Sequence, residues 1–88
     1  MISVDDIKVG DRFVIMETAV EIEQWDTDGF SARVNQTEFC TEGTRESFVG
    51  FYIENKGERA TDQSWQQCID LMKERMKNHG IEPDGVLQ

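Results

Sequence analysis

Polar and apolar residues alternate along residues 14–23 of the chain. The even positions from 14 to 22 are apolar or neutral, whereas three of the odd positions are the glutamates Glu17, Glu21 and Glu23. A period of two is typical of a half-buried β-strand. We therefore predict a strand or a strand pair that begins near Arg12, with its acids facing outward.

Residues 26–29, Asp-Thr-Asp-Gly, predict a tight turn, because Asp favours turn positions and Gly tolerates a positive φ. A three-residue loop ending at the glycine would place Glu23 opposite Arg33 and Ile22 opposite Val34. This register pairs apolar residues with one another and adds one ion pair. The two segments should form a hairpin.

Two further strands are predicted over residues 37–41 and 47–54, joined by the polar region around Gly43. In the second of them apolar residues occupy both odd and even positions, which would give two apolar faces. Near the N-terminus, Ser3 and Asp6 have the spacing of a capped helical turn over residues 4–8.

A helix is predicted from Thr61 or Asp62 to about His79, where Gly80 ends it. Its apolar residues recur at helical spacing and form one stripe, which should face the core. The members of the stripe are Trp65, Cys68, Ile69, Met72, Met76 and His79.

These elements predict an α+β fold, with a four- to five-stranded antiparallel sheet packed by one C-terminal α-helix. The sheet could stay open or curl like an SH3-type barrel. Eighty-eight residues with 38% apolar content provide one core. We expect a single domain over residues 1–82, followed by a flexible tail over residues 83–88.

Acidic residues are concentrated in the predicted hairpins. Between Glu17 and Glu54 there are nine acids and two bases, which is most of the formal net charge of −9. Such a field attracts basic partners and repels nucleic acid and anionic membranes. The expected partner is therefore a basic protein, with no direct binding of nucleic acid or membrane.

Motifs for catalysis, cofactors or metals are not found in the sequence. Asp26 and Asp28 precede a glycine as in a calcium loop, but the first and twelfth ligand positions would be Gln24 and Asn35. Glu21 and Glu23 have the spacing of many solvated strands, and a domain this small does not provide a deep sugar cleft. We expect no enzyme activity, no cofactor and no metal.

The two cysteines, Cys40 and Cys68, lack metal-ligand spacing and are expected to be thiols; the alternative is a disulfide between them. No apolar run could cross a bilayer, and the first residues lack the pattern of a signal peptide. We therefore expect a cytoplasmic protein.

The outward sheet face is the best candidate for a binding site. If the helix stripe covers one face, the aromatic rings of Trp25, Phe48 and Tyr52 would lie on the other with Glu21 and Glu23. Aromatic groups ringed by charge are typical of protein-binding patches. Alternatively, a curled sheet would bury these rings. The predicted binding residues are Glu21, Glu23, Trp25, Asp26, Asp28, Phe48 and Tyr52.

In size, acidity and lack of motifs the chain resembles small phage-encoded inhibitors of host defence, including anti-CRISPR and anti-restriction proteins. The resemblance is one of general character and assigns no residue. It implies an inhibitor that occupies the basic surface of a nucleic-acid-handling protein by imitating phosphate charge. The alternative is a structural or assembly subunit, or a homodimeric adaptor, that uses the aromatic sheet face.

Overall fold

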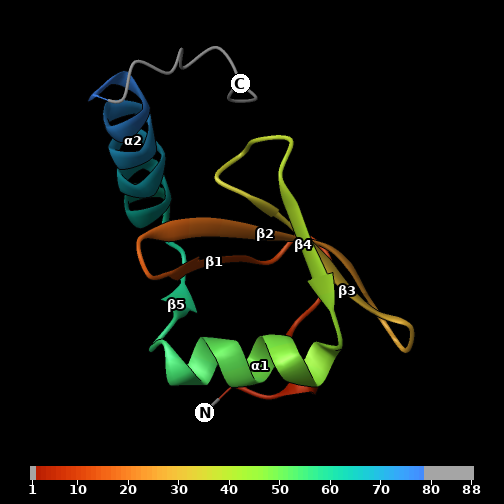
Figure 1. Cartoon of the computed structure of the whole chain (residues 1–88). Coiled ribbons are helices and arrows are strands. Elements are labelled where there is room, and N and C mark those ends of the chain that lie inside the picture. Colours follow the sequence, from red (N-terminus) through yellow and green to blue (C-terminus); the bar gives the residue numbers. More distant parts are fainter. Residues whose placement is uncertain (1, 79–88) are drawn as a thin grey trace.

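The computed structural model describes residues 2–78, and its centre is an open five-stranded antiparallel sheet with strand order β4-β3-β2-β1-β5 (Figure 1). The predicted α+β class and C-terminal helix are confirmed. The sheet does not close into a barrel, because β4 and β5 lie at its two ends. The strands are β1 (Arg12–Ile15), β2 (Thr18–Asp26), β3 (Gly29–Val34), β4 (Cys40–Gly43) and β5 (Glu58–Arg59).

The predicted strand pair near Arg12 is a hairpin of β1 and β2. Met16 and Glu17 form its two-residue turn, and both have positive φ, 52° and 62°. This left-handed pair matches the twist of the flanking strands. Because the hairpin places Phe13 opposite Val20, the core residues of β1 are at odd positions and those of β2 at even positions.

The predicted register of the β2–β3 hairpin is wrong. Ile22 lies opposite Ala32, not Val34, and the loop has two residues because Asp26 pairs with Gly29. The register shifts between Ile22 and Gln24, which leaves Glu23 as the extra residue of a β-bulge. A bulge reverses the facing of the residues that follow it.

The strand predicted over residues 47–54 is wrong. These residues form most of the helix α1 (Arg45–Glu54). Thr44 caps this helix, since its hydroxyl accepts a hydrogen bond from the backbone N–H of Ser47 at 3.1 Å. Phe48 and Tyr52, four residues apart, share the helix side that faces the sheet. Apolar residues on its other sides hide the helical period in the sequence.

The preceding predicted strand, 37–41, begins later than expected. Thr37 is buried in the turn after β3, and β4 covers only Cys40–Gly43. At the N-terminus, the predicted turn over residues 4–8 is present as the shorter 3-10 helix η1 (Val4–Asp6), where the Asp6 carboxylate accepts the Ser3 backbone N–H at 2.9 Å.

The second helix, α2 (Asp62–Asn78), follows the prediction closely. Trp65, Cys68 and Ile69 are buried against Ala19 of β2, while Met72 packs at the edge of this cluster. Ala19 and Val20 point to opposite sides of β2, so α1 and α2 cover opposite faces of the sheet (Figure 1). The predicted roles of His79 and of the tail lie outside the described residues.

Candidate functional site

The predicted exposed aromatic face does not exist, because its rings belong to the core under α1. Phe48 is 4% exposed, and Trp25 and Tyr52 pack around the same cluster. Ring centroids of Trp25 and Phe48 lie 5.6 Å apart in an edge-on arrangement. The prediction that Trp25, Phe48 and Tyr52 form an exposed face is therefore wrong, because Phe48 is buried and the other two rings are partly buried against it.

Two local features explain this error. The bulge at Glu23 turns Trp25 to the α1 side of the sheet, where its indole Nε1 donates a hydrogen bond to the Val4 carbonyl at 3.0 Å. Phe48 and Tyr52 lie on a helix, so their spacing of four places them on one side. In the sequence, Thr44 before an apolar run was a signal for that helix, but nothing marked the bulge.

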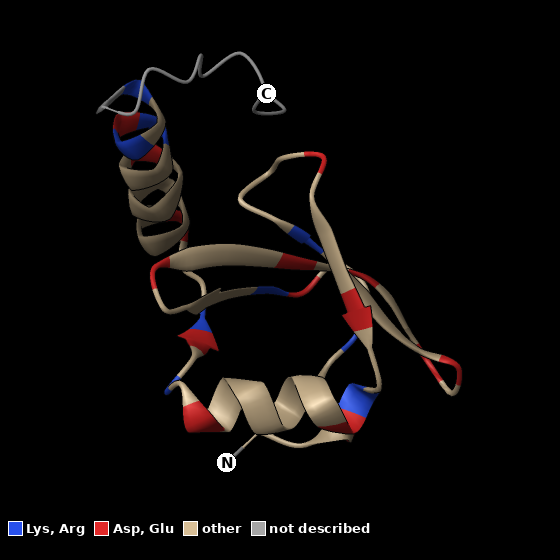
Figure 2. Cartoon of the chain, viewed as in Figure 1, with Lys and Arg blue, Asp and Glu red and all other residues tan. Residues whose placement is uncertain are grey.

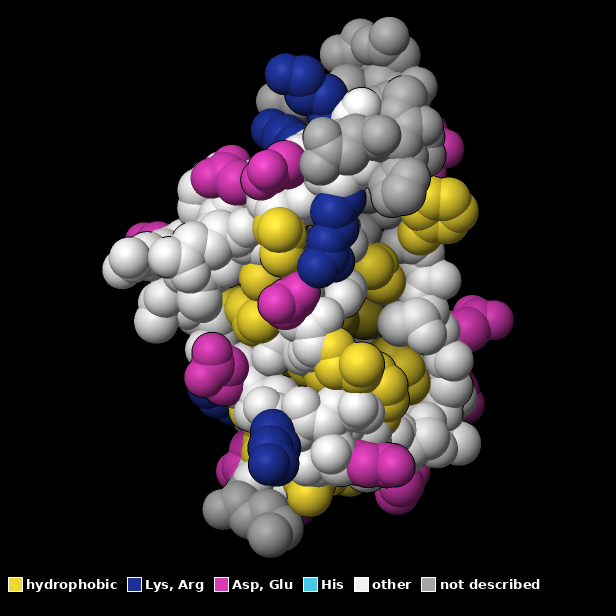
Figure 3. Space-filling view, turned by 60° about the vertical axis from the view of Figure 1, so that its left-hand side comes forward, with side chains coloured by type: hydrophobic (Ala, Val, Ile, Leu, Met, Phe, Trp, Pro, Cys, Tyr) yellow, Lys and Arg dark blue, Asp and Glu magenta, His cyan; other side chains and the backbone are white. Residues whose placement is uncertain are grey.

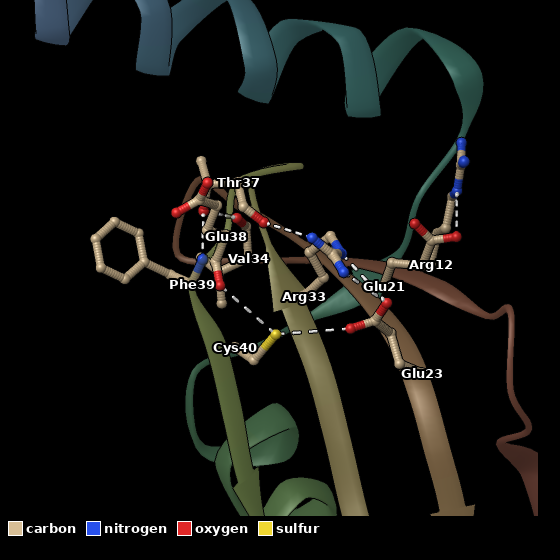
Figure 4. Close-up of polar contacts among 9 residues, drawn as sticks. All are labelled: Arg12, Glu21, Glu23, Arg33, Val34, Thr37, Glu38, Phe39 and Cys40. Atoms are coloured by element: carbon tan, nitrogen blue, oxygen red, sulfur yellow. Dashed lines mark hydrogen bonds and ion pairs between the residues drawn. The ribbon is translucent and has the colours of Figure 1, made fainter. Parts of the chain in front are cut away.

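Glu21 and Glu23 lie on the opposite sheet face, and each contacts an arginine (Figure 4). The distance from Arg12 to Glu21 is 3.7 Å, and from Arg33 to Glu23 it is 3.1 Å. The predicted Glu23–Arg33 ion pair is thus confirmed, although the two are diagonal neighbours. Both pairs are partly exposed, and each arginine offsets the charge of its glutamate.

Arg33 also fixes the turn between β3 and β4. Its Nη1 donates to the Thr37 carbonyl at 2.9 Å, while the Thr37 hydroxyl donates to the Val34 carbonyl at 2.7 Å (Figure 4). The Cys40 thiol lies 3.6 Å from Glu23 as a weak donor. These bonds give the acidic sheet face a defined shape.

Asp26 and Asp28 form the tip of the β2–β3 hairpin. Asp26 accepts the backbone N–H of Asp28 at 2.9 Å, so its carboxylate stabilises the turn. Gly29 lies against the backbone of Gly43, just before α1. The tip therefore lies beside β4 and the first turn of α1.

This junction gathers carboxylates from three elements at one end of the molecule, which we call the acidic end (Figure 2). Arg45, in the first turn of α1, offsets part of its charge. Within residues 2–78, no ion pair joins its four carboxylates to a base. The acidic end consists of Asp26, Asp28, Glu42 and Glu46.

An apolar groove lies between α1 and the sheet, with a volume of about 480 Å³; we call it the α1 groove. Val20, Val34 and Phe48 contribute to its lining, and its exposed hydrophobic residues are Met16 and Phe51, at 66% and 48%. Figure 3 shows hydrophobic side chains in a recess near the centre of one face. Sequence reasoning missed this groove, because it depends on α1 being a helix.

Both cysteines are free thiols in different surroundings. Cys40 is exposed on β4, whereas burial raises the pKa of the Cys68 thiol, with smaller contributions from Glu17 and Glu58. The described part of the chain contains no cluster of three His, Cys, Asp or Glu side chains that could hold a metal ion. Nor does any helix within residues 2–78 have the length and apolarity needed to cross a membrane.

Comparisons were made with protein-family models, with curated proteins and with solved structures, and none of the three found a match for this chain.

Proposed function

We propose that the protein is a non-catalytic binding module whose acidic end docks on the basic surface of a nucleic-acid-handling protein. The observation that carries the proposal is the uneven compensation of charge. Glu17, Glu21 and Glu23 each have an arginine partner, whereas the four carboxylates of the acidic end have none within residues 2–78. Charge at one end that Arg45 offsets only in part provides a field that steers a basic partner.

The acidic end also suits the imitation of phosphate charge. Its carboxylates are held by a hairpin tip, a strand and a helix start, so their positions are set by backbone structure rather than by a flexible segment. A rigid array loses less conformational entropy on binding than a disordered acidic stretch. The protein would then compete with nucleic acid for the partner, as an inhibitor of the phage anti-defence type acting in the cytoplasm.

Glu21 and Glu23 have a smaller part in this proposal than the sequence suggested. Their arginines would have to be displaced or shared before either glutamate met a new base. The rings of Trp25, Phe48 and Tyr52 pack in the core under α1, with Phe48 buried and the other two partly buried, so they do not present an open aromatic face to a partner. The alternative of an assembly subunit that uses the aromatic sheet face loses that surface for the same reason.

The test is a charge reversal at the acidic end with a matched control. The triple variant Asp28→Lys, Glu42→Lys and Glu46→Lys changes exposed side chains, so the fold should persist. Loss of a close interfacial charge pair costs more than about 1 kcal/mol, so three reversals should weaken partner binding by more than about 100-fold. The control reverses the same number of exposed acids elsewhere: Glu54, Asp70 and Glu74.

Partners are isolated by pull-down and mass spectrometry, and their affinities are then measured at about 50 and 500 mM salt. The proposal is supported if affinity falls steeply with salt and if the acidic-end variant, but not the control variant, binds more weakly. Equal loss in both variants would mean that only net charge matters. No loss in either would make the acids a solubility feature and the proposal wrong.

A further inference from the structure

Strand β4 is an edge strand whose outer side is open. Within residues 2–78 it pairs with β3 alone, and all four of its residues are exposed. The N–H of Val34 donates to the Phe39 carbonyl at 3.0 Å, which sets the alternation of the ladder. In an antiparallel pair this alternation directs the backbone groups of Thr41 toward β3 and those of Cys40 and Glu42 toward the open side.

The opposite edge of the sheet differs. Strand β5 has only two residues, Glu58 and Arg59, and the Arg59 side chain is held by the Asp6 carbonyl at 2.6 Å and by Asp11 at 3.2 Å. A short, charged edge is a common way to prevent further pairing. Strand β4 is therefore the edge that can accept another strand.

The α1 groove lies beside this open edge. Thr41, which pairs with buried Ala32, faces the α1 side and lines the groove together with Phe51. Side chains of a strand added to β4 would alternate between the two faces. Those on the α1 side would reach apolar surface. Those on the other side would lie beside the side chain of Glu42, because Glu42 borders the groove but its pairing with Ser31 directs its side chain to the opposite face.

We propose that β4 accepts an extended segment of the basic partner as a sixth strand, with apolar side chains in the α1 groove and alternating basic side chains beside Glu42. This inference rests on the proposed function, from which it takes the premise that the partner is basic. Strand addition uses backbone hydrogen bonds for affinity and alternate side chains for specificity. The segment is therefore recognised by its alternation of apolar and basic residues.

A second copy of this chain fits the edge less well. Two β4 strands paired about a two-fold axis would bring the Glu42 side chains of both copies onto the same sheet face, between molecules that each carry a net charge of −9. Like charges close together across a strand pair are destabilising. A basic segment has the opposite charge at the same position.

The test uses a blocked hexapeptide of alternating valine and lysine, and NMR titration of the whole protein. Glu42→Pro removes the outward N–H and the charge, while Glu42→Gln removes only the charge. Proline is tolerated on edge strands because an outward N–H has no ladder partner. We expect Glu42→Gln to bind a few-fold more weakly than the native protein and Glu42→Pro at least about tenfold more weakly than Glu42→Gln.

A peptide of the same composition with its valines and lysines in separate blocks is the second control, and should bind more weakly. Three outcomes would overturn the inference: no shift with the alternating peptide at millimolar concentration, equal binding by the two Glu42 variants, or equal binding of the two peptides. A β4-mediated dimer, lost in Glu42→Pro, would identify a second copy as the occupant and would also overturn it. The double reversal Asp28→Lys and Glu46→Lys leaves Glu42 and β4 unchanged, and it tests the proposed function separately because that function needs no added strand.

Discussion

The two helices cover opposite faces of the same sheet with different kinds of side chain. Under α1, aromatic rings meet at tilted or edge-to-face angles, with Phe48 at the centre between Phe13, Trp25 and Phe30. Under α2 the core contains fewer buried residues, and Trp65 and Ile69 pack on Ala19. Two small cores thus stabilise one sheet, and each depends on a single helix.

The difference also concerns how each helix is specified. In α2 the apolar residues form one stripe, so the sequence alone favours a helix that buries that stripe. In α1 apolar residues lie all round, and Phe51 and Ile53 stay exposed. Tertiary packing of Phe48 and Tyr52, rather than periodicity, decides how α1 lies.

The largest expected effect comes from truncation at the centre of either core. Phe48→Ala should lower the free energy of unfolding by about 3–5 kcal/mol, because it removes a buried ring and leaves a cavity. Trp65→Ala should cost a similar amount on the other face. Chemical denaturation measures both.

The control for this comparison is Phe51→Ala, which should cost less than about 1 kcal/mol because the ring is half exposed. A Phe51 effect as large as that of Phe48 would show that α1 buries a different side from the one described.

The N-terminal caps of α1 and α2 should have smaller effects on stability, and the two effects should be similar. Thr44 accepts the N–H of Ser47, and Thr61 accepts the N–H of Ser64 at 3.0 Å. Thr44→Ala and Thr61→Ala should each lower the unfolding free energy by about 1 kcal/mol. Thr44→Ser, which keeps the accepting hydroxyl, serves as a control for Thr44. A difference of several-fold between the two caps in thermal unfolding would contradict the shared geometry.

The two cysteines allow a test by chemistry. Exposed Cys40 should react with a thiol reagent on the order of 100-fold faster than Cys68, because Cys68 is 6% exposed and its raised pKa lowers the thiolate fraction. Mass spectrometry after timed alkylation distinguishes the two sites. Similar rates would mean that α2 detaches easily from the sheet.

The smallest effect concerns the N-terminal turn, which packs beside α1. Hydrogen bonds from the backbone N–H and the hydroxyl of Ser3 lower the pKa of Asp6 below its ordinary value of 3.8. A lowered pKa stabilises the fold above that value, and the contribution is lost as the pH falls through the folded-state pKa. Ser3→Ala should raise the Asp6 pKa, which carboxyl NMR titration measures; an unchanged pKa would contradict this role of the hydroxyl.

Sequence reasoning was successful where a short-range rule determines the structure. The cap at Ser3, the presence of strands on both sides of the turn near Asp26 and the stripe of α2 all follow from residues a few positions apart. The fold class followed from these elements. The concentration of acids was likewise visible, but not which of them an arginine would neutralise, since Glu17 meets Arg75 from a distant helix.

The failures have physical causes of two kinds. One extra residue at Glu23 reverses the facing of Trp25, and no residue type there marks the bulge. The segment 47–54 satisfies both a strand and a helix pattern locally, so its packing on the sheet decides between them. Both errors moved aromatic rings from the core to the predicted surface, which is why the predicted binding face was wrong.

The position of β5 has a consequence for the order of folding. Strands β1 to β4 pair with neighbours in the chain, but β5 returns to β1 after more than forty residues, where the Ala60 N–H reaches the Arg12 carbonyl at 3.0 Å. Closing so long a loop loses chain entropy before any contact compensates for it. We expect the hairpins to form first and this strand to join last, so that pulse-labelling by hydrogen exchange should find the Ala60 amide protected after those of β2 and β3.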